Sequence, residues 1–311
     1  MAFRIGSDRL TAEVAPLGAE LVRLTDAAGR DYLWNGDPAY WSGRAPILFP
    51  IVGTLNDDRF RWKGREYCLP RHGFARRREF TVVAHDSDRL LLRLEADRAT
   101  REVWPFDFAL DMAFAVRGAA LTMTATVTNR GGEAMPVSFG FHPALRWPLP
   151  GARDASGHRL RFERPEPAPV RRLDEDGLLA PSPRSSPIEG DLLRLDESLF
   201  IADALILDRI ESRALVYEGP GAAPVEIDFR GMPYLGLWSK PGAGFLCVEL
   251  WQGHSDPAGF EGALDEKPGM LPIAAGMHHS FGMSIAIGQE KAQSHERTSR
   301  EAHEMPQEPQ S

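Results

Sequence analysis

The chain has 311 residues, of which 43% are hydrophobic and 26% are charged, an ordinary balance for a globular protein. Its net charge of −8 gives no general attraction to nucleic acid or to anionic membranes, so neither is expected as a partner. The sequence has no run of about 18 apolar residues and no signal-peptide pattern at its start, so we expect a cytoplasmic protein. Its two cysteines, Cys68 and Cys247, are too few for a disulfide framework and are predicted to be small core residues.

Predicted strands dominate the chain. Short candidates come first, at residues 19–25, 31–34, 59–62, 65–69, 79–85 and 90–94. Residues 106–116 and 121–127 then alternate apolar and polar side chains, and the Arg117-Gly118-Ala119 segment between them predicts the turn of a β-hairpin. Further strands are predicted at residues 214–218, 225–229, 234–239, 245–251 and 278–287. Many short strands separated by glycine and proline favour a sandwich or a barrel over alternating strands and helices.

Two regions depart from this pattern. Residues 150–200 are rich in proline, arginine and aspartate, and we expect them to form a long surface excursion of the kind that often carries function. Residues 289–311 are polar and contain no aromatic side chain, which predicts a disordered tail. We therefore expect a single domain over residues 1–288. The sequence has no glycine-rich phosphate loop that would indicate a bound nucleotide.

Three segments place a titratable side chain at the end of an apolar run. Residues 69–76, 137–144 and 245–253 contain His72, His142 and Glu249, respectively. Such positions are typical of strand ends that deliver a side chain into a cleft. Burying the Glu249 carboxylate is costly unless the group is paired or used. From its own segment, a structural ion pair and a catalytic carboxylate are equally good interpretations of Glu249.

Each histidine taken alone is better explained as a hydrogen-bonded core residue. His72 and His142 together with Glu249 favour proton transfer, because these side chains are the usual acid–base partners near neutral pH. The same three residues would also suit a metal site of two histidines and one carboxylate, although the His-x-His spacing of cupin sites is absent. His254 follows Glu249 closely and is a further candidate for the same cleft.

Five short stretches form an ordered set along the chain: residues 45–53 (APILFPIVG), 72–76 (HGFAR), 138–143 (SFGFHP), 200–206 (FIADALI) and 248–249 (VE). Together they resemble the aldose 1-epimerase superfamily, in the branch that includes the LacX-like proteins and is related to hexose-6-phosphate mutarotases. The resemblance implies an all-β, mostly antiparallel β-supersandwich of the galactose mutarotase type. It also implies an isomerase that interconverts the α and β anomers of a hexose without a metal or other cofactor.

The resemblance implies a role for each residue of the acid–base set. Glu249 corresponds to the general base that removes the proton of the anomeric hydroxyl, and His142 to the general acid that protonates the ring oxygen. In the resting site we expect Glu249 to be ionised and His142 to be protonated. His72 corresponds to a second histidine close to the ring oxygen. Relatives often have Glu-Pro where this chain has Glu249-Leu250, a difference that removes no catalytic group.

The resemblance also implies residues that bind the substrate. Asp203 corresponds to an acid that hydrogen-bonds a ring hydroxyl, Arg76 to an arginine of the phosphate-using relatives, and Arg59 to the substrate-binding arginine of galactose mutarotases. Arg71 stands where relatives often have glutamine and adds positive charge beside the cleft, and Trp251 offers an aromatic face for a sugar. The expected partner is a monosaccharide or a sugar phosphate, handled by a monomer or a homodimer. A hexose-6-phosphate 1-epimerase and a non-catalytic carbohydrate-binding protein remain as alternatives.

Overall fold

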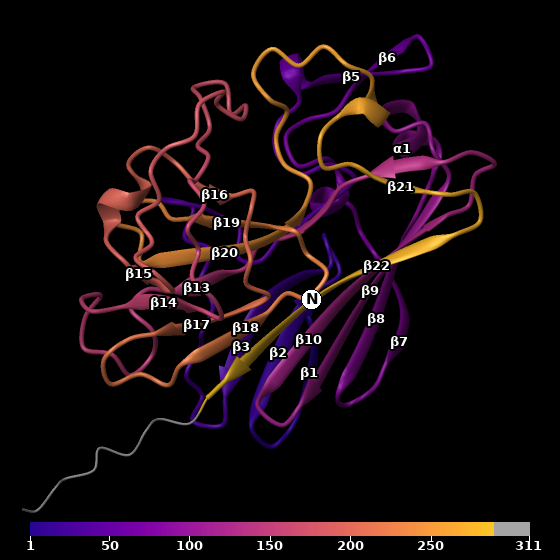
Figure 1. Cartoon of the computed structure of the whole chain (residues 1–311). Helices are drawn as coiled ribbons and strands as arrows, with labels where there is room; N and C mark the ends of the chain where they lie inside the picture. The colour runs from indigo at the N-terminus through magenta and orange to yellow at the C-terminus, as the bar shows by residue number, and fades with distance from the viewer. Residues whose placement is uncertain (289–311) are drawn as a thin grey trace, which may run out of the picture.

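Strands make up most of the regular structure in the computed structural model, which describes residues 1–288. Neighbouring strands run antiparallel in the sheets of this region, so the predicted all-β, mostly antiparallel class is confirmed. Figure 1 shows two large sheets lying against each other, with smaller sheets and loops around them. The predicted tail at residues 289–311 lies outside the described residues.

The largest sheet has nine strands, and in Figure 1 it extends from β15 and β14 on the left to β8 and β7 on the right. In spatial order its strands are β15 (Leu192–Arg194), β14 (Arg159–Phe162), β17 (Ala214–Glu218), β18 (Val225–Asp228), β22 (His278–Ile287), β10 (Ala120–Asn129), β9 (Phe108–Arg117), β8 (Arg89–Glu95) and β7 (Thr81–His85). The strands β9 and β10 form the predicted hairpin, and Gly118 in its turn has a φ of 56°. This positive φ is a conformation that glycine adopts without steric penalty.

The second large sheet has six strands. They are β16 (Leu205–Leu207), β19 (Tyr234–Trp238), β20 (Phe245–Gln252), β12 (Phe139–Phe141), β4 (Ile47–Leu48) and β13 (Ala144–Arg146). The strand β12 pairs with one end of β20 and β13 pairs with the other end. Regular strand pairing is therefore interrupted at two residues, His142 and Pro143, opposite the middle of β20, although the Pro143 carbonyl still accepts the Val248 N–H at 3.1 Å.

Smaller elements complete the fold. A three-stranded sheet contains β1 (Phe3–Gly6), β2 (Leu10–Ala15) and β3 (Glu20–Asp26); two pairs are β5 (Arg59–Trp62) with β6 (Arg65–Cys68) and β11 (Met135–Val137) with β21 (Leu271–Ile273). The helices are α1 (Arg98–Val103) and the 3-10 turns η1 (Asn56–Asp58), η2 (Ala75–Arg77), η3 (Glu197–Phe200) and η4 (Leu264–Glu266).

The main core lies between the sheets, where the apolar face of each alternating strand is buried. In β2 and β9, residues that alternate along the strand are buried, as their apolar–polar pattern requires. The rings of Phe139 in β12 and Phe281 in β22 stack with centroids 5.2 Å apart, so the two large sheets contact each other directly. The strands β1 and β2 pack against β9 and cover another part of the large sheet.

The region 150–200 is more regular than the sequence indicates. Its strands β14 and β15 extend the large sheet, and bridges between Leu173 and Leu179 and between Val170 and Arg184 hold its remaining turns.

One cysteine prediction is wrong, because Cys68 is exposed on the β5–β6 hairpin, whereas Cys247 is buried as expected. The hairpin projects from the body of the molecule, so its outer residues have no second layer to cover them.

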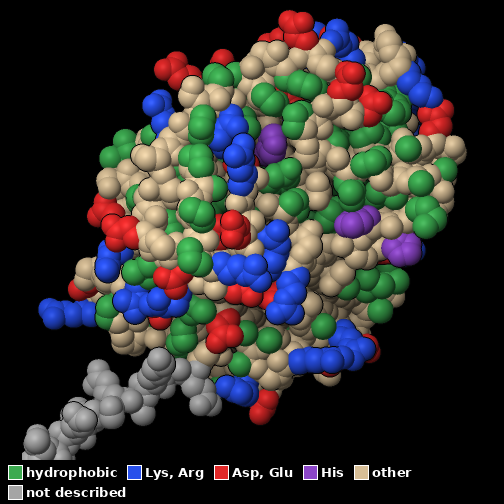
Figure 2. Space-filling view, in the orientation of Figure 1, with side chains coloured by type: hydrophobic (Ala, Val, Ile, Leu, Met, Phe, Trp, Pro, Cys, Tyr) green, Lys and Arg blue, Asp and Glu red, His purple; other side chains and the backbone are tan. Residues whose placement is uncertain are grey.

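On the face of the molecule drawn in Figure 2, neither positive nor negative charge dominates. Figure 2 shows Lys and Arg side chains interspersed with Asp and Glu on that side. Within residues 1–288, none of the helices is both long enough and apolar enough to cross a membrane.

Candidate active site

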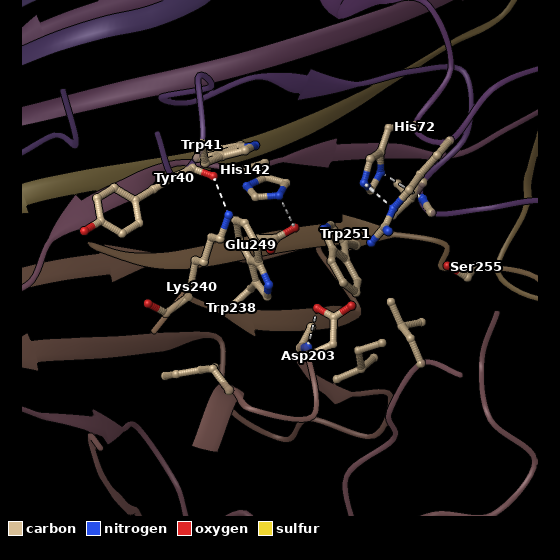
Figure 3. Close-up of a pocket in the computed structure, with 18 of the residues that line it drawn as sticks. Tyr40, Trp41, His72, His142, Asp203, Trp238, Lys240, Glu249, Trp251 and Ser255 are labelled. Carbon is tan, nitrogen blue, oxygen red and sulfur yellow. Dashed lines mark hydrogen bonds and ion pairs between the residues drawn. The ribbon is translucent and has the colours of Figure 1, made fainter. Parts of the chain in front are cut away.

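A cleft of about 570 Å³ opens on the face of the six-stranded sheet that is turned away from the main core. This volume is suited to a small molecule such as a monosaccharide. Seven of the predicted site residues line it: Arg71, His72, Arg76, His142, Asp203, Glu249 and Trp251. Figure 3 shows Glu249 and His142 pointing toward each other, with His72 to one side and Asp203 on the opposite wall.

The position of Glu249 follows from the alternation of β20. Leu246, Val248 and Leu250 belong to the main core, so the odd-numbered residues of the strand face the cleft. The apolar–polar alternation of residues 245–251 in the sequence likewise predicts that Cys247 and Glu249 share one face of the strand. Trp251 lies on the same face, two residues further along. A one-residue shift in pairing would turn the carboxylate into the apolar core, so the register of β20 is essential to the site.

Two glycines make room for the indole ring of Trp251. Gly236 of β19 is paired with Glu249 of β20, and a Cβ atom at Gly236 would lie 2.5 Å from this ring. Gly140 of β12 is paired with Trp251 of β20, and a Cβ atom at Gly140 would lie 2.9 Å from the ring. Both separations are too short for real atoms. The glycine in the SFGFHP stretch therefore serves to seat an aromatic wall beside the carboxylate.

His142 occupies the break between β12 and β13. Its Nε2 atom lies 3.1 Å from Oε2 of Glu249, and both side chains are almost completely buried. The imidazole stacks on Trp41, with ring centroids 5.0 Å apart, and meets the edge of Trp238. Pro143 disfavours a helical conformation at His142, and β13 then resumes pairing with β20. The ring of His142 is thus held on two sides while one nitrogen faces the carboxylate.

Burial shifts the pKa values of Glu249 and His142 in opposite directions. Loss of solvent raises the pKa of Glu249 to about 8, with Arg71 acting against the shift and Asp203 adding to it. Loss of solvent lowers the pKa of His142 to about 3. Each shift favours the neutral form, whereas the sequence-based hypothesis has an ionised Glu249 beside a protonated His142. In the neutral pair Glu249 carries the proton, and in the ionised pair His142 carries it. Both pairs therefore hold one proton, and they interconvert by its transfer across the 3.1 Å contact.

His72 is fixed by the backbone of the segment that precedes it. The Gly53 N–H donates to Nδ1 of His72 at 3.0 Å, and the His72 N–H donates to the Gly53 carbonyl at 2.8 Å. Arg71 Nε–H also donates to Nε2 of this ring at 3.2 Å. A neutral imidazole accepts a hydrogen bond at only one nitrogen, so the Gly53 N–H and the Arg71 Nε–H compete for the ring.

His72 and Gly73 both adopt positive φ angles, 64° and 69°. A Cβ atom at Gly73 would lie 2.3 Å from the carbonyl oxygen of Phe49, so only glycine fits this close approach. Burial and the nearby Arg71 charge hold the pKa of His72 well below its usual value. His72 is therefore neutral near pH 7, and its ring lines the cleft.

Two arginines bring positive charge to this side of the cleft. Arg76 donates from Nη2 to the Arg71 carbonyl at 2.9 Å, and its buried Nε has no hydrogen-bond partner among the described residues. Burial and the neighbouring Arg77 and Arg71 charges lower the pKa of Arg76 to about 10. Across residues 1–288, no carboxylate forms an ion pair with Arg71 or Arg76. Arg76 therefore remains cationic at neutral pH.

Asp203 stands on the opposite wall, directly after the turn that follows η3. Its φ is 61°, and its Oδ1 accepts the Ala204 N–H at 2.8 Å. Phe200 and Ile201 of the same turn also line the cleft, and Ile201 is exposed at its rim. Part of the 150–200 excursion and the turn after it therefore build one side of the site.

Arg59 and His254 do not reach this cleft. Arg59 lies on the exposed β5–β6 hairpin, where its Nη1 bonds Glu66 Oε1 on the partner strand at 2.6 Å. His254 is buried beside Tyr234, and its Nδ1 contacts the Ser255 carbonyl. We therefore leave both residues out of the site.

Lys240 is a cleft residue that the sequence analysis missed. It donates from Nζ to the Tyr40 carbonyl at 3.2 Å and lies beside Pro241 at the rim. The signal available in the sequence was a charged residue in the Ser-Lys-Pro-Gly segment that follows a predicted strand. Such segments occur on many surface turns, so the pattern alone does not single this lysine out.

The structure groups a different set of metal-ligating side chains from the one that the sequence analysis considered. Ligand atoms of His142, Cys247 and Glu249 lie within 4.8 Å of one another, and His72 is not part of this group. Burial raises the pKa of the Cys247 thiol well above its usual value. Because a thiol binds metals as the thiolate, this shift weakens Cys247 as a ligand.

Known proteins resemble this chain along most of its length. The family model described as aldose 1-epimerase matches residues 1–290. The chain belongs to the aldose 1-epimerase family. Within that family, it is 31% identical over 283 residues to the plasmid-borne protein LacX of Lactococcus lactis subsp. lactis, an alignment that covers 88% of this chain and 95% of LacX. The resemblance inferred from the five short stretches is thereby confirmed.

Solved structures of aldose epimerase relatives share the fold. A galactose mutarotase related enzyme from Lactobacillus acidophilus superposes with a TM-score of 0.85 at 27% identity, covering 93% of this chain and 98% of that protein. A galactose mutarotase-like protein from Lactobacillus casei gives the same TM-score and identity, covering 92% of this chain and all of the other. The implied galactose mutarotase-like β-supersandwich is therefore confirmed.

Proposed function

We propose that this protein is an aldose 1-epimerase that interconverts the α and β anomers of a hexose. The observation that carries the proposal is the contact of 3.1 Å between His142 Nε2 and Glu249 Oε2 inside a cleft of monosaccharide size. Ring opening of a cyclic hemiacetal needs one group to take a proton from the anomeric hydroxyl and another to give a proton to the ring oxygen. A carboxylate and an imidazole that face the same cavity meet this need.

In the proposed reaction, Glu249 removes the proton of the C1 hydroxyl while His142 protonates the ring oxygen. The C1–O5 bond breaks, and the open-chain aldehyde forms. Rotation about C1–C2 presents the other face of the carbonyl, and the ring closes with the two proton transfers reversed. His72 binds the sugar close to the ring oxygen, which its place in the lining of the cleft supports. Asp203 accepts a hydrogen bond from a ring hydroxyl, and Trp251 packs against the sugar.

The shared proton of the pair supports this division of roles. The active arrangement has the proton on His142 and an ionised Glu249, and it forms from the neutral pair by transfer across their contact. No proton has to enter from solvent to begin the cycle. After ring opening, the proton taken from the sugar lies on Glu249 and His142 is neutral, which is the arrangement that burial favours.

A hexose 6-phosphate is the second candidate substrate. The observation that favours it is the pair of cleft arginines, Arg71 and Arg76, with which no carboxylate forms an ion pair within residues 1–288. A guanidinium group binds phosphate through two parallel hydrogen bonds. The free hexose and the phosphate ester share the same reacting atoms, so the proton-transfer mechanism applies to both.

Exchange between anomers measured by NMR on glucose, galactose and their 6-phosphates tests the proposal. Faster exchange of at least one of these sugars with the wild-type protein, and none with Glu249→Gln, is the expected result. Binding without faster exchange would instead favour the alternative of a non-catalytic carbohydrate-binding protein. A strong preference for the 6-phosphates that disappears in Arg76→Gln would identify the second candidate as the substrate. The cytoplasmic location, the single domain and the monomeric or homodimeric state stay predictions.

A further inference from the structure

Asp203 occupies a position that its own backbone does not favour. Its φ of 61° lies in the left-handed region, where a side chain with a Cβ atom is less stable than glycine. The turn that carries it, residues 199–203, lies outside the sheets, so strand pairing does not hold it in place. Two local hydrogen bonds hold it, from the Asp203 N–H to the Phe200 carbonyl at 3.1 Å and from the Ala204 N–H to Asp203 Oδ1 at 2.8 Å. Contacts from another segment add to these.

One side chain provides most of those contacts. Arg172 donates from Nη1 to the Asp203 carbonyl at 2.6 Å and from Nη2 to the Leu199 carbonyl at 2.8 Å. Its Nη1 also lies 3.5 Å from the Ala202 carbonyl. A single planar guanidinium thus spans both ends of the turn. Hydrogen bonds from a charged donor are stronger than those between neutral groups, especially where solvent is partly excluded.

The backbone of Arg172 is itself anchored to the sheet that bears Glu249. The neighbouring Arg171 exchanges two backbone hydrogen bonds with Ile206 of β16, at 2.8 and 3.0 Å. The Arg172 carbonyl also accepts the Ala180 N–H at 2.9 Å. Arg172 is half-buried and does not line the cleft. The guanidinium therefore connects a fixed segment of the sheet to a turn that has no strand partner.

We propose that Arg172 is a positioning residue that holds the turn at residues 199–203 so that the Asp203 carboxylate meets a hydroxyl of the sugar. This inference rests on the proposed function, because it requires Asp203 to bind the substrate. It assigns Arg172 no contact with the sugar and no part in proton transfer. Loss of the guanidinium would let the turn relax and move the carboxylate away from its acceptor position. Sugar binding would then weaken, whereas the Glu249–His142 pair would be unchanged.

Kinetics of Arg172→Gln, Arg172→Lys, Asp203→Asn and the Arg172→Gln/Asp203→Asn double variant test this role. We expect Arg172→Gln to raise KM roughly three- to tenfold with little change in kcat, the effect of weakening one polar contact to the substrate. Arg172→Lys should recover part of this loss, because an ammonium can still bond one carbonyl. The double variant should have the KM of Asp203→Asn alone, since Arg172 acts only through that residue. Independent, multiplying effects on KM would overturn the inference.

Arg171→Gln is the matched control. This adjacent arginine bonds the Ala180 carbonyl at 2.5 Å and lies 3.4 Å from Asp208, without contacting the turn. Its replacement should leave KM unchanged, which separates a specific effect of Arg172 from general loosening of the segment. A KM increase equal to that of Arg172→Gln would contradict a specific role.

Hydrogen exchange followed by mass spectrometry examines the same contact without requiring activity. Peptides covering residues 199–204 should exchange faster in Arg172→Gln than in the wild type, and peptides from β20 should not change. Unchanged exchange at residues 199–204 would overturn the role of Arg172 for any function of the protein. An inactive wild-type protein with faster exchange in the variant would instead refute the proposed function and leave the contact between Arg172 and the turn supported.

Discussion

The two walls of the cleft are built in different ways. Glu249 stands in the middle of β20, which is paired with β19 on one side and with β12 and β13 on the other. Asp203 stands on a turn whose carbonyls are held by the side chain of Arg172. Backbone pairing therefore supports the wall that carries Glu249, and side-chain hydrogen bonds from Arg172 support the opposite wall.

This difference suits the tasks of the two walls. Proton transfer is efficient only when donor and acceptor lie within hydrogen-bonding distance, so its groups benefit from the most rigid support. A wall that recognises hydroxyl groups can stand on a turn, where changes in sequence alter the contacts without disturbing a sheet. We expect substitutions on the β20 wall to affect kcat and those on the Asp203 wall to affect KM. The following predictions test this expectation, beginning with the largest effect.

Glu249→Gln and His142→Asn should cause the greatest losses. Each removes one proton-transfer group, and positioned groups of this kind contribute about 10²–10⁴-fold. We expect kcat for anomer exchange to fall by that factor in either variant, measured by polarimetry or NMR after subtraction of the uncatalysed rate. Retention of full activity by either variant would refute the assignment of that residue.

The pH dependence should identify the shared proton. With the pKa of Glu249 at about 8 and that of His142 at about 3, the pair holds one proton between these values and none above about pH 8. We expect kcat/KM to be flat from about pH 5 to pH 7 and to fall about tenfold per pH unit well above 8. If Glu249 acted without a protonated His142, kcat/KM would instead rise as the pH passes through 8.

Gly236→Ala should damage the β20 wall without removing a polar group. The new methyl group would collide with the Trp251 ring, which must then move beside Glu249. We expect kcat/KM to fall roughly thirtyfold and the free energy of unfolding to fall by about 1–3 kcal/mol, as for other overpacked sites. Gly282→Ala on β22 is the control, because a Cβ atom there meets nothing within 4 Å. Chemical denaturation and NMR kinetics provide the two measurements.

Asp203→Asn should raise KM about tenfold and change kcat by less than about threefold, because it weakens one charge-assisted hydrogen bond to the substrate. Steady-state kinetics with the preferred hexose measure both constants. A large fall in kcat with an unchanged KM would mean that this wall takes part in the chemical step, and the contrast between the two walls would then be wrong.

Arg59→Gln should have the smallest effect. The side chain is exposed and paired with Glu66 outside the cleft, so we expect KM for hexoses and their 6-phosphates to stay within about twofold of the wild-type value. Arg76→Gln is the comparison within the cleft, where KM for a 6-phosphate should rise if that ester is the substrate. A clear rise in KM for Arg59→Gln would show that Arg59 takes part in substrate binding.

The alternation of apolar and polar residues was enough to predict the β9–β10 hairpin and the face of β20 that carries Glu249. This is possible because the side-chain period of a strand is a local property of the chain. The short strands β12, β13 and β16 were not predicted as strands, since three residues carry too little pattern. The 31–34 segment, which was predicted as a strand, contributes only isolated bridges. The strands of the β9–β10 hairpin are adjacent in the sequence, so each is stabilised by a nearby segment. The strands β12, β13 and β16 pair with segments that are more distant in the sequence.

The sequence by itself determined the all-β class, the family and the residues that could transfer protons, because strand periodicity and motif order are written along the chain. Only the tertiary structure decided which of those residues meet. It brought His142 to within 3.1 Å of Glu249, left Arg59 on a distant hairpin and placed Arg172 behind Asp203. Contacts between segments that are far apart in sequence depend on sheet register and on the packing of turns, which no local pattern specifies.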